Sequence, residues 1–310
     1  MGNKSIYEMI VENLKEDKET LKKEFRLPSE DNKGISFAEG AMDGISIYHM
    51  GMPQIGDEDI AVIGNAITIA GSGDFEKADA AFKDFCNKYR VVCIIDEIQR
   101  YIIDHTRELN AGVIFRYAVH LVLESADVES VKAGIVILEL FHLDEDVKKI
   151  IRMLALSDEF TLYAVFLMRN WENGQIEVLN AAKKVSGWGR IHAVHFIEPE
   201  NDEIKSWLLK EGVHNWVVPA YSGLDCFEKA DVARLLDNDK LSYEELHSIL
   251  EIVDAILDEG PVQGISAIEN PKAILGKVLR HAESMLPLEP KDYEVISKIS
   301  DWQEKAGEDL

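Results

Sequence analysis

The segment DEIQRYIIDH at positions 96–105 is the first place in the chain where side chains of catalytic type recur at a regular spacing. On a helix, residues three and four apart share one side, so Glu97, Arg100, Asp104 and His105 would lie together. A histidine beside carboxylates suits general acid–base catalysis. The same pattern is more typical of a solvated helix face with intrahelical ion pairs, and we favour that interpretation.

Two histidines, His192 and His195, stand three residues apart in the sequence IHAVH. Histidines at this spacing are able to share a metal ion, but a metal site also needs a third ligand and acidic groups behind the ligands. The pair alone gives no reason to expect such a site. We therefore predict no metal and no cofactor, and we count both histidines as candidate binding residues.

Tryptophan and arginine recur together further along the chain, as Arg169 with Trp171 and as Trp188 with Arg190. These residue types are the usual anchors of interaction surfaces, because they bury a large area at low entropic cost. They are also able to pack between neighbouring helices. All four are candidate binding residues.

The segment FAEGAMDGISIYHMGMPQIGDED, residues 37–59, is unusually rich in glycine and methionine. Its glycines allow close approach of another group to the backbone, and Asp43 and His49 are its candidate binding residues. We expect a glycine-weakened helix that ends near Gly51. The segment is either a cap that folds along the rest of the protein or an element that contacts a ligand, and the sequence leaves both open.

The charge balance restricts the class of partner. The 310 residues carry 57 acidic and 33 basic side chains, a net charge of −24. Such a charge repels nucleic-acid phosphates, so we expect a basic protein or peptide as partner and no nucleic acid. No apolar run approaches the ~20 residues that span a bilayer, so we expect no membrane association. Three cysteines without metal-like pairing favour a reduced, cytoplasmic protein, either a monomer or a weak oligomer.

Helical signals dominate the chain. Helical spacing over residues 4–25 predicts an N-terminal helix, and a proline-free stretch follows from Gln54 to Glu198. Within that stretch we predict helices at 58–70, 74–88, 91–106, 110–124, 127–142, 144–156, 159–170 and 173–185. Asp74, Asp127, Asp144 and Asn201 are the predicted N-caps. Over 241–260 we predict a helix with a capping box of Ser242 and Glu245.

Three stretches, 130–157, 159–186 and 187–213, resemble one another at a spacing of 28 to 29 residues. Each pairs an apolar segment with a charged amphipathic one, which is typical of stacked helix pairs. We therefore predict an all-α fold of the α-solenoid type. The alternative is a doubly wound α/β fold with strands at TLYAVFLMRN, RIHAVHFIEP and NWVVPA. Polar residues within those runs and the lack of a glycine-rich phosphate loop count against it.

The sequence GWGRIHAVHFIEPENDEIKSWLLKEGV, with the preceding DEFTLYAVFLMRNWENGQIEV, resembles the HEAT or armadillo type of helical repeat. More narrowly, it is similar to uncharacterised bacterial proteins that share the patterns GWG-x-IHAV and EP-x-x-x-E-I-x-x-WLL, and the resemblance covers about Phe37 to Pro261. It implies a helical-repeat architecture and transfers no residue roles. The unit is shorter than the roughly 40 residues of ordinary HEAT repeats, and their regular proline and Asp/Arg ladder are missing.

Taken together, these features predict an N-terminal helix and connecting segment over 1–57 and a HEAT-like repeat domain over 58–310. We expect a non-enzymatic scaffold that binds a basic protein or peptide, in one form an inhibitor or immunity-type protein. The alternative is a small-molecule enzyme or lyase that uses Glu97, Asp104 and His105, or His192 with His195.

Overall fold

The computed structural model describes residues 4–28 and 37–308. Within these residues the regular structure is helical throughout, apart from one isolated bridge between Leu14 and Leu21. None of the helices it describes has the length and apolar character needed to pass through a bilayer. The chain divides into two compact units, of which the first ends at Gly189 and the second begins at Arg190. The predicted division into 1–57 and 58–310 stays a prediction.

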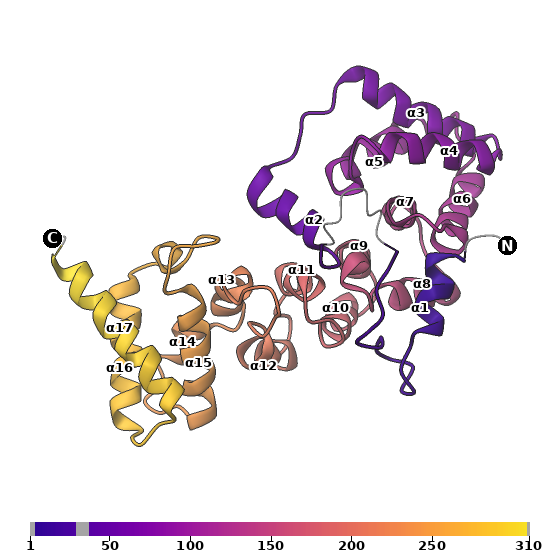
Figure 1. Ribbon diagram of the computed structural model, residues 1–310. Coiled ribbons are helices and arrows are strands. Elements are labelled where there is room, and N and C mark those ends of the chain that lie inside the picture. Colours follow the sequence, from indigo (N-terminus) through magenta and orange to yellow (C-terminus); the bar gives the residue numbers. More distant parts are fainter. Residues whose placement is uncertain (1–3, 29–36, 309–310) are drawn as a thin grey trace. The chain divides into compact units, whose positions relative to one another are not determined.

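From residue 57 onward the helices follow one another with short connections (Figure 1). Those of the first unit are α1 (Ile6–Glu12), α2 (Ala41–Ile45), the π-helix η1 (Ser46–Met50), α3 (Asp57–Gly71), α4 (Phe75–Cys86), the 3-10 turn η2 (Val91–Cys93), α5 (Ile95–Asp104), α6 (Ala111–Glu124), α7 (Val128–Leu138), α8 (Glu145–Leu154), α9 (Asp158–Met168) and α10 (Gly174–Ala182). The unit boundary falls inside α11 (Trp188–Phe196). Those of the second unit are α12 (Asp202–Glu211), α13 (Ala220–Lys229), α14 (Val232–Leu235), α15 (Tyr243–Ile256), the 3-10 turn η3 (Ile265–Ala267), α16 (Pro271–Ser284) and α17 (Pro290–Glu308).

The predicted N-caps are confirmed. The side chains of the four predicted N-caps each accept a hydrogen bond from a backbone N–H in the first turn; they are Asp74, Asp127, Asp144 and Asn201. Ser242 and Glu245 form the predicted capping box of α15. Local hydrogen-bonding chemistry therefore fixes where these helices begin.

The N-terminal helix predicted over 4–25 is wrong beyond its first two turns, because α1 ends at Glu12. A turn around Asp17 takes the place of the predicted helix. The Asp17 side chain accepts hydrogen bonds from the backbone N–H groups of Glu19 and Thr20, and Lys18 adopts a positive φ of 56°. An aspartate that bonds to backbone amides two and three residues ahead stabilises a turn and competes with helix.

The core of the first unit is built around α7, whose residues from Ser130 to Leu138 are all buried. Helices α5, α6 and α9 pack around it (Figure 1). Gly134 allows a close crossing, since a Cβ there would lie 2.9 Å from the Cβ of Leu121 on α6. The glycine is thus needed for contact between the two helices.

The three similar stretches of the sequence each form two helices, α7 with α8, α9 with α10, and α11 with α12. The α/β alternative is therefore wrong: the first two supposed strands lie in α9 and α11, and NWVVPA runs through a loop into the start of α13. Apolar residues on all sides of α9 reflect burial of a helix, which periodicity alone does not distinguish from a buried strand.

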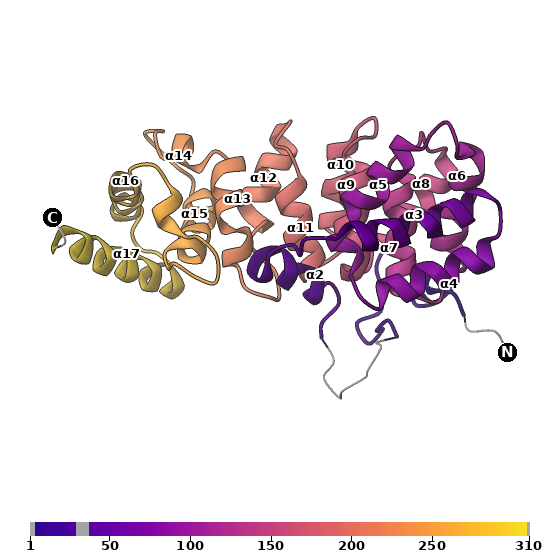
Figure 2. The same ribbon diagram turned by 90° about the horizontal axis from the view of Figure 1, so that it is seen from above.

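In the second unit, α15 is the central helix. It contacts α12, α13, α16 and α17, and Figure 2 shows α16 and α17 beside it. Its apolar residues, which include Leu246, Ile249, Leu250 and Val253, are buried. Its opposite side carries acidic residues that remain at the surface.

Candidate functional site

A fully buried lysine lies in the middle of the first unit. The Lys132 ammonium group is 2.7 Å from Asp43, 2.9 Å from Glu129 and 2.5 Å from Glu159. Its side chain has no exposed surface, and that of Asp43 is 2% exposed. A lysine is almost never buried unless it is paired, and here three carboxylates surround it.

The same three carboxylates also contact Arg90. Its guanidinium group lies 2.8 Å from Asp43, 3.0 Å from Glu129 and 3.5 Å from Glu159. Two cations and three carboxylates therefore form six ion pairs with a formal charge of −1. We call these five residues the buried charge network.

The remaining oxygen atoms of the buried charge network are also hydrogen-bonded. The second oxygen of Glu129 accepts from the backbone N–H of Val91 at 2.7 Å, and that of Glu159 accepts from Gly40 at 2.6 Å. Tyr163 donates its hydroxyl hydrogen to Asp43 at 3.0 Å. A buried ionic cluster whose carboxylate oxygens are all hydrogen-bonded fixes the elements that carry it, here α2, α7 and α9.

The electrostatics of the buried charge network keep its members ionised. Burial by itself raises the pKa of Asp43, but Lys132 and Arg90 reverse that effect and hold it below its ordinary value. Burial likewise opposes the charge of Lys132, and the surrounding carboxylates raise its pKa above the usual range. Opposite charges within about 4 Å favour the charged forms of both partners.

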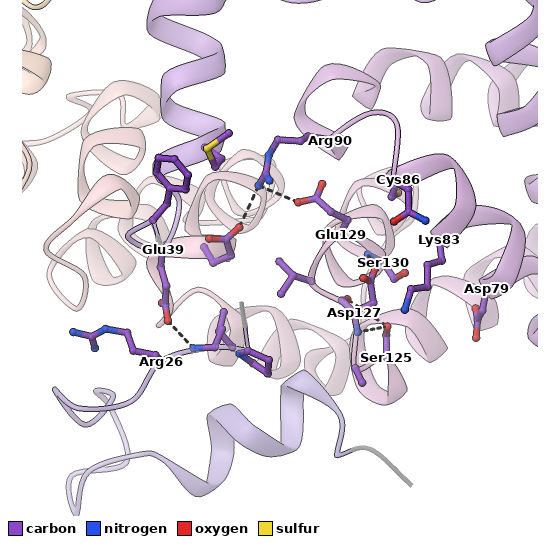
Figure 3. Close-up of a pocket in the computed structure, with 18 of the residues that line it drawn as sticks. Arg26, Glu39, Asp79, Lys83, Cys86, Arg90, Ser125, Asp127, Glu129 and Ser130 are labelled. Carbon is purple, nitrogen blue, oxygen red and sulfur yellow. Dashed lines mark hydrogen bonds and ion pairs between the residues drawn. The ribbon is translucent and has the colours of Figure 1, made fainter. Parts of the chain in front are cut away.

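A pocket of about 700 Å³ adjoins this network, and Figure 3 shows Arg90 and Glu129 pointing toward each other at its wall. Glu39 also lines it and accepts hydrogen bonds from the Ser157 hydroxyl and the Leu27 N–H. Burial raises the pKa of Cys86, another lining residue, to about 12, which keeps it a neutral and unreactive thiol. The acidic groups at this part of the wall are thus already bonded within the protein.

The three residues of the GWG motif, Gly187, Trp188 and Gly189, make close contacts within the first unit. Trp188 is 5% exposed and packs against Gly44, where a Cβ would lie 2.2 Å from the indole ring. The N–H groups of Gly187 and Gly189 donate to the Asp158 carboxylate at 3.0 and 2.7 Å. Gly44 thus lets α2 approach Trp188 closely, and Gly187 and Gly189 let the start of α11 approach α9. Together with the buried charge network, these contacts make α2 an integral part of the first unit.

The other aromatic and arginine candidates lie in separate places. Trp171 is covered by Lys148 and Arg152 of α8, at 5.3 and 5.2 Å from its ring. Arg169 lies over the Phe166 ring at 3.8 Å. In the second unit, Arg190 lies over Trp207 at 5.4 Å.

The histidine candidates also differ from one another. His192 is 2% exposed, whereas the His195 ring is 53% exposed and hydrogen-bonded to Asp225 at 3.0 Å. His49 is exposed on η1. Across the described parts of the chain, no three histidine, cysteine or carboxylate side chains are grouped to hold a metal ion.

The 96–105 segment lies on α5 and its end. The ring of His105 stacks on that of Tyr101 at 4.0 Å, and its Nδ1 contacts the Tyr101 carbonyl at 2.9 Å. Within the described residues no ion pair joins Glu97, Arg100 and Asp104, so the expected ladder of ion pairs does not form. His105 is instead used in local packing.

An acidic groove in the second unit is the feature that the sequence did not reveal. About 510 Å³ in volume, it is bounded by the loop at 213–220, α15 and α17. Five carboxylates and two lysines line it, a formal charge of −3 with neutral histidines; they are Glu251, Asp254, Asp258, Asp292, Glu294, Lys291 and Lys298. Among the residues that the structure describes, neither Asp258 nor Glu294 makes a side-chain hydrogen bond or ion pair. The groove therefore carries uncompensated negative charge.

Trp216 lies on the loop that borders this groove, and it is 74% exposed. Asn215 shapes the loop, since its side-chain oxygen accepts from the N–H groups of Val217 and Val218 at 3.0 and 2.9 Å. Arg190 donates to the His214 carbonyl at 2.6 Å on the other side. The indole is thus presented to solvent from a loop that is held by its own hydrogen bonds.

The sequence held partial signals for both features. Lys132 is the one charged residue among the apolar positions of its helix after Glu129, and the run NWVV lies outside the three similar stretches of the sequence. Neither signal identifies a partner residue. Comparison with protein-family models, with curated proteins and with solved structures found no match to this chain.

Proposed function

We propose that this protein is a non-enzymatic helical-repeat protein that binds a basic segment of another protein or peptide in the acidic groove of its second unit. One observation carries the proposal: a groove of charge −3, in which two carboxylates make no hydrogen bond or ion pair with any described residue, lies beside a tryptophan that is 74% exposed. An inhibitor or immunity-type role toward a cationic protein is a particular form of this proposal.

The carboxylates of the acidic groove and the neighbouring Trp216 would contribute to binding in different ways. Carboxylates such as Asp258 and Glu294 attract a basic segment during encounter and so raise the association rate. Trp216 would bury its indole against an apolar part of the segment and slow dissociation, because large aromatic residues dominate the energy of interfaces. The groove is large enough for a few side chains. Because the groove is negatively charged, the partner would insert lysine or arginine side chains.

The architecture that we propose is an α-solenoid. In the first unit α7 and α8 both pack against α9, as successive helix pairs of a solenoid do. Asp158, at the start of α9, bonds to Gly187, 29 residues later, at the start of the next pair. Glu129 and Glu159, each the second residue of its helix, both hold Lys132. These contacts between successive helix pairs support the proposed stacking.

The proposal is tested with a labelled synthetic peptide of arginine and leucine, whose binding and release are followed by fluorescence anisotropy. We expect Trp216→Ala to weaken binding by about tenfold or more, mainly through faster release. Asp258→Asn with Glu294→Gln should slow association and reduce its dependence on salt.

Matched controls are present in the same unit. Leu286→Ala removes another exposed apolar side chain, 58% exposed, and Glu228→Gln with Asp239→Asn removes two exposed carboxylates outside the groove. These variants should bind like the parent. An absence of binding, or equal losses in the groove and control variants, would refute the proposed function.

A further inference from the structure

Two histidines of the second unit line the acidic groove, and each of them faces carboxylates with both ring nitrogens. For His214, on the loop that carries Trp216, Nδ1 lies 3.3 Å from Glu211 and Nε2 lies 3.1 Å from Glu251. The loop is thus connected to α12 and to α15 through one imidazole ring.

His247 repeats this arrangement between α15 and α17. Its Nδ1 lies 2.7 Å from Asp292, and its Nε2 lies 3.8 Å from Glu251. Asp292 is 2% exposed and also accepts a hydrogen bond from the Tyr243 hydroxyl at 2.8 Å. Glu251 is therefore shared by the two histidines.

The number of hydrogens on each ring decides whether these contacts attract. A neutral imidazole has one N–H, so it donates to one carboxylate and presents a lone pair to the other. An imidazolium donates from both nitrogens and satisfies both carboxylates. Protonation of the two rings also changes the formal charge of the groove from −3 to −1. Glu251 then lies between two imidazolium groups.

We propose that His214 and His247 make the groove pH-dependent, so that it binds a basic segment when both rings are neutral and binds it weakly when both are charged. This inference rests on the proposed function. The remaining charged groups that line the groove do not cancel the effect. They are Lys291 and Lys298 of α17, Asp254 of α15, which pairs with Lys298 at 2.6 Å, and the carboxylates Asp258 and Glu294. Histidine is the side chain that ordinarily changes charge between about pH 5 and 8, which sets the range.

The test measures the affinity of the protein for the arginine and leucine peptide, with blocked ends, at about pH 5.5 and about pH 8. The peptide itself does not titrate in this range. For the parent we expect binding about tenfold weaker at the lower pH, because two positive charges are added within a few ångströms of the bound cations. His214→Gln with His247→Gln should bind at both pH values with affinities within about twofold of each other.

His120→Gln is the matched control, since His120 of the first unit also lies between two carboxylates, Asp79 at 2.9 Å and Glu124 at 3.2 Å. It should keep the full pH dependence. If the double variant is not folded by circular dichroism, the exposed His214→Gln alone should reduce the dependence by at least half in logarithmic terms. Affinity that is independent of pH in the parent, or pH dependence that persists in the histidine variants, would overturn the inference. A peptide that does not bind even at about pH 8 would instead refute the proposed function itself.

Discussion

Replacing Lys132 by methionine should destabilise the first unit strongly. The substitution keeps most of the side-chain volume and removes the charge that contacts Asp43, Glu129 and Glu159. Three carboxylates are then left with Arg90 alone, and the formal charge of the buried charge network changes from −1 to −2. Breaking a buried ion pair by removal of one partner costs about 3–5 kcal/mol.

The assay is thermal and urea unfolding followed by circular dichroism. For a unit of this size, a loss of about 3–5 kcal/mol lowers the melting temperature by about 6 to 20 °C. Lys149→Met is the control, because Lys149 pairs with Asp146 on the surface, where the two side chains are 67% and 90% exposed. It should change the free energy of unfolding by less than about 0.5 kcal/mol.

A second substitution separates charge from packing. Adding Asp43→Asn to Lys132→Met removes one of the uncompensated buried carboxylates, so the double variant should be less destabilised than the sum of the two single variants, with a coupling of at least about 1 kcal/mol. If Lys132→Met costs less than about 1 kcal/mol, or if the two substitutions are additive, the buried charge network does not fix α2 as we describe.

Three further outcomes are expected. Gly44→Ala places a Cβ 2.2 Å from the Trp188 ring and should lower the free energy of unfolding by about 1–3 kcal/mol. Gly276→Ala, in the open interior of α16, should instead stabilise the second unit by up to about 1 kcal/mol. Thermal unfolding in which the two substitutions change the stability in the same direction would contradict this. Asp144→Ala removes the acceptor of two N–H groups of α8 and should cost about 1 kcal/mol in urea unfolding; no loss would show that the cap contributes nothing. Burial raises the pKa of Glu39 above its ordinary 4.5, so its charge is unfavourable at neutral pH. Glu39→Gln should then be more stable than the parent at about pH 7, and the difference should vanish as the pH falls below 4.5; a difference that is constant with pH would refute the assignment.

Local chemistry made much of the fold predictable. An aspartate or asparagine just before a helix accepts hydrogen bonds from the free N–H groups of its first turn. Asp127 and Asn201 do so at the two positions where the sequence predicts N-caps. The helix predicted over 4–25 failed for an equally local reason, the turn formed around Asp17, which its glutamate and lysine neighbours obscured.

The candidate sites were less predictable because they depend on contacts between residues far apart in the sequence. Asp43 was singled out for its glycine-rich surroundings, but its partner Lys132 lies 89 residues away. Trp188 was predicted as a binding candidate, and its packing on Gly44 depends on a segment more than a hundred residues earlier. Trp216 is not among the predicted binding residues, since the exposure of a side chain follows from the packing of the whole unit.

The proposed function requires that a basic segment bind in the acidic groove beside Trp216. The most direct test is the nuclear magnetic resonance spectrum of the five tryptophan indole N–H groups during addition of the arginine and leucine peptide. We predict that the Trp216 resonance moves with the peptide and that those of Trp171 and Trp188 do not. Movement at Trp171 or Trp188 with an unchanged Trp216 signal would contradict the claim and place the binding surface in the first unit.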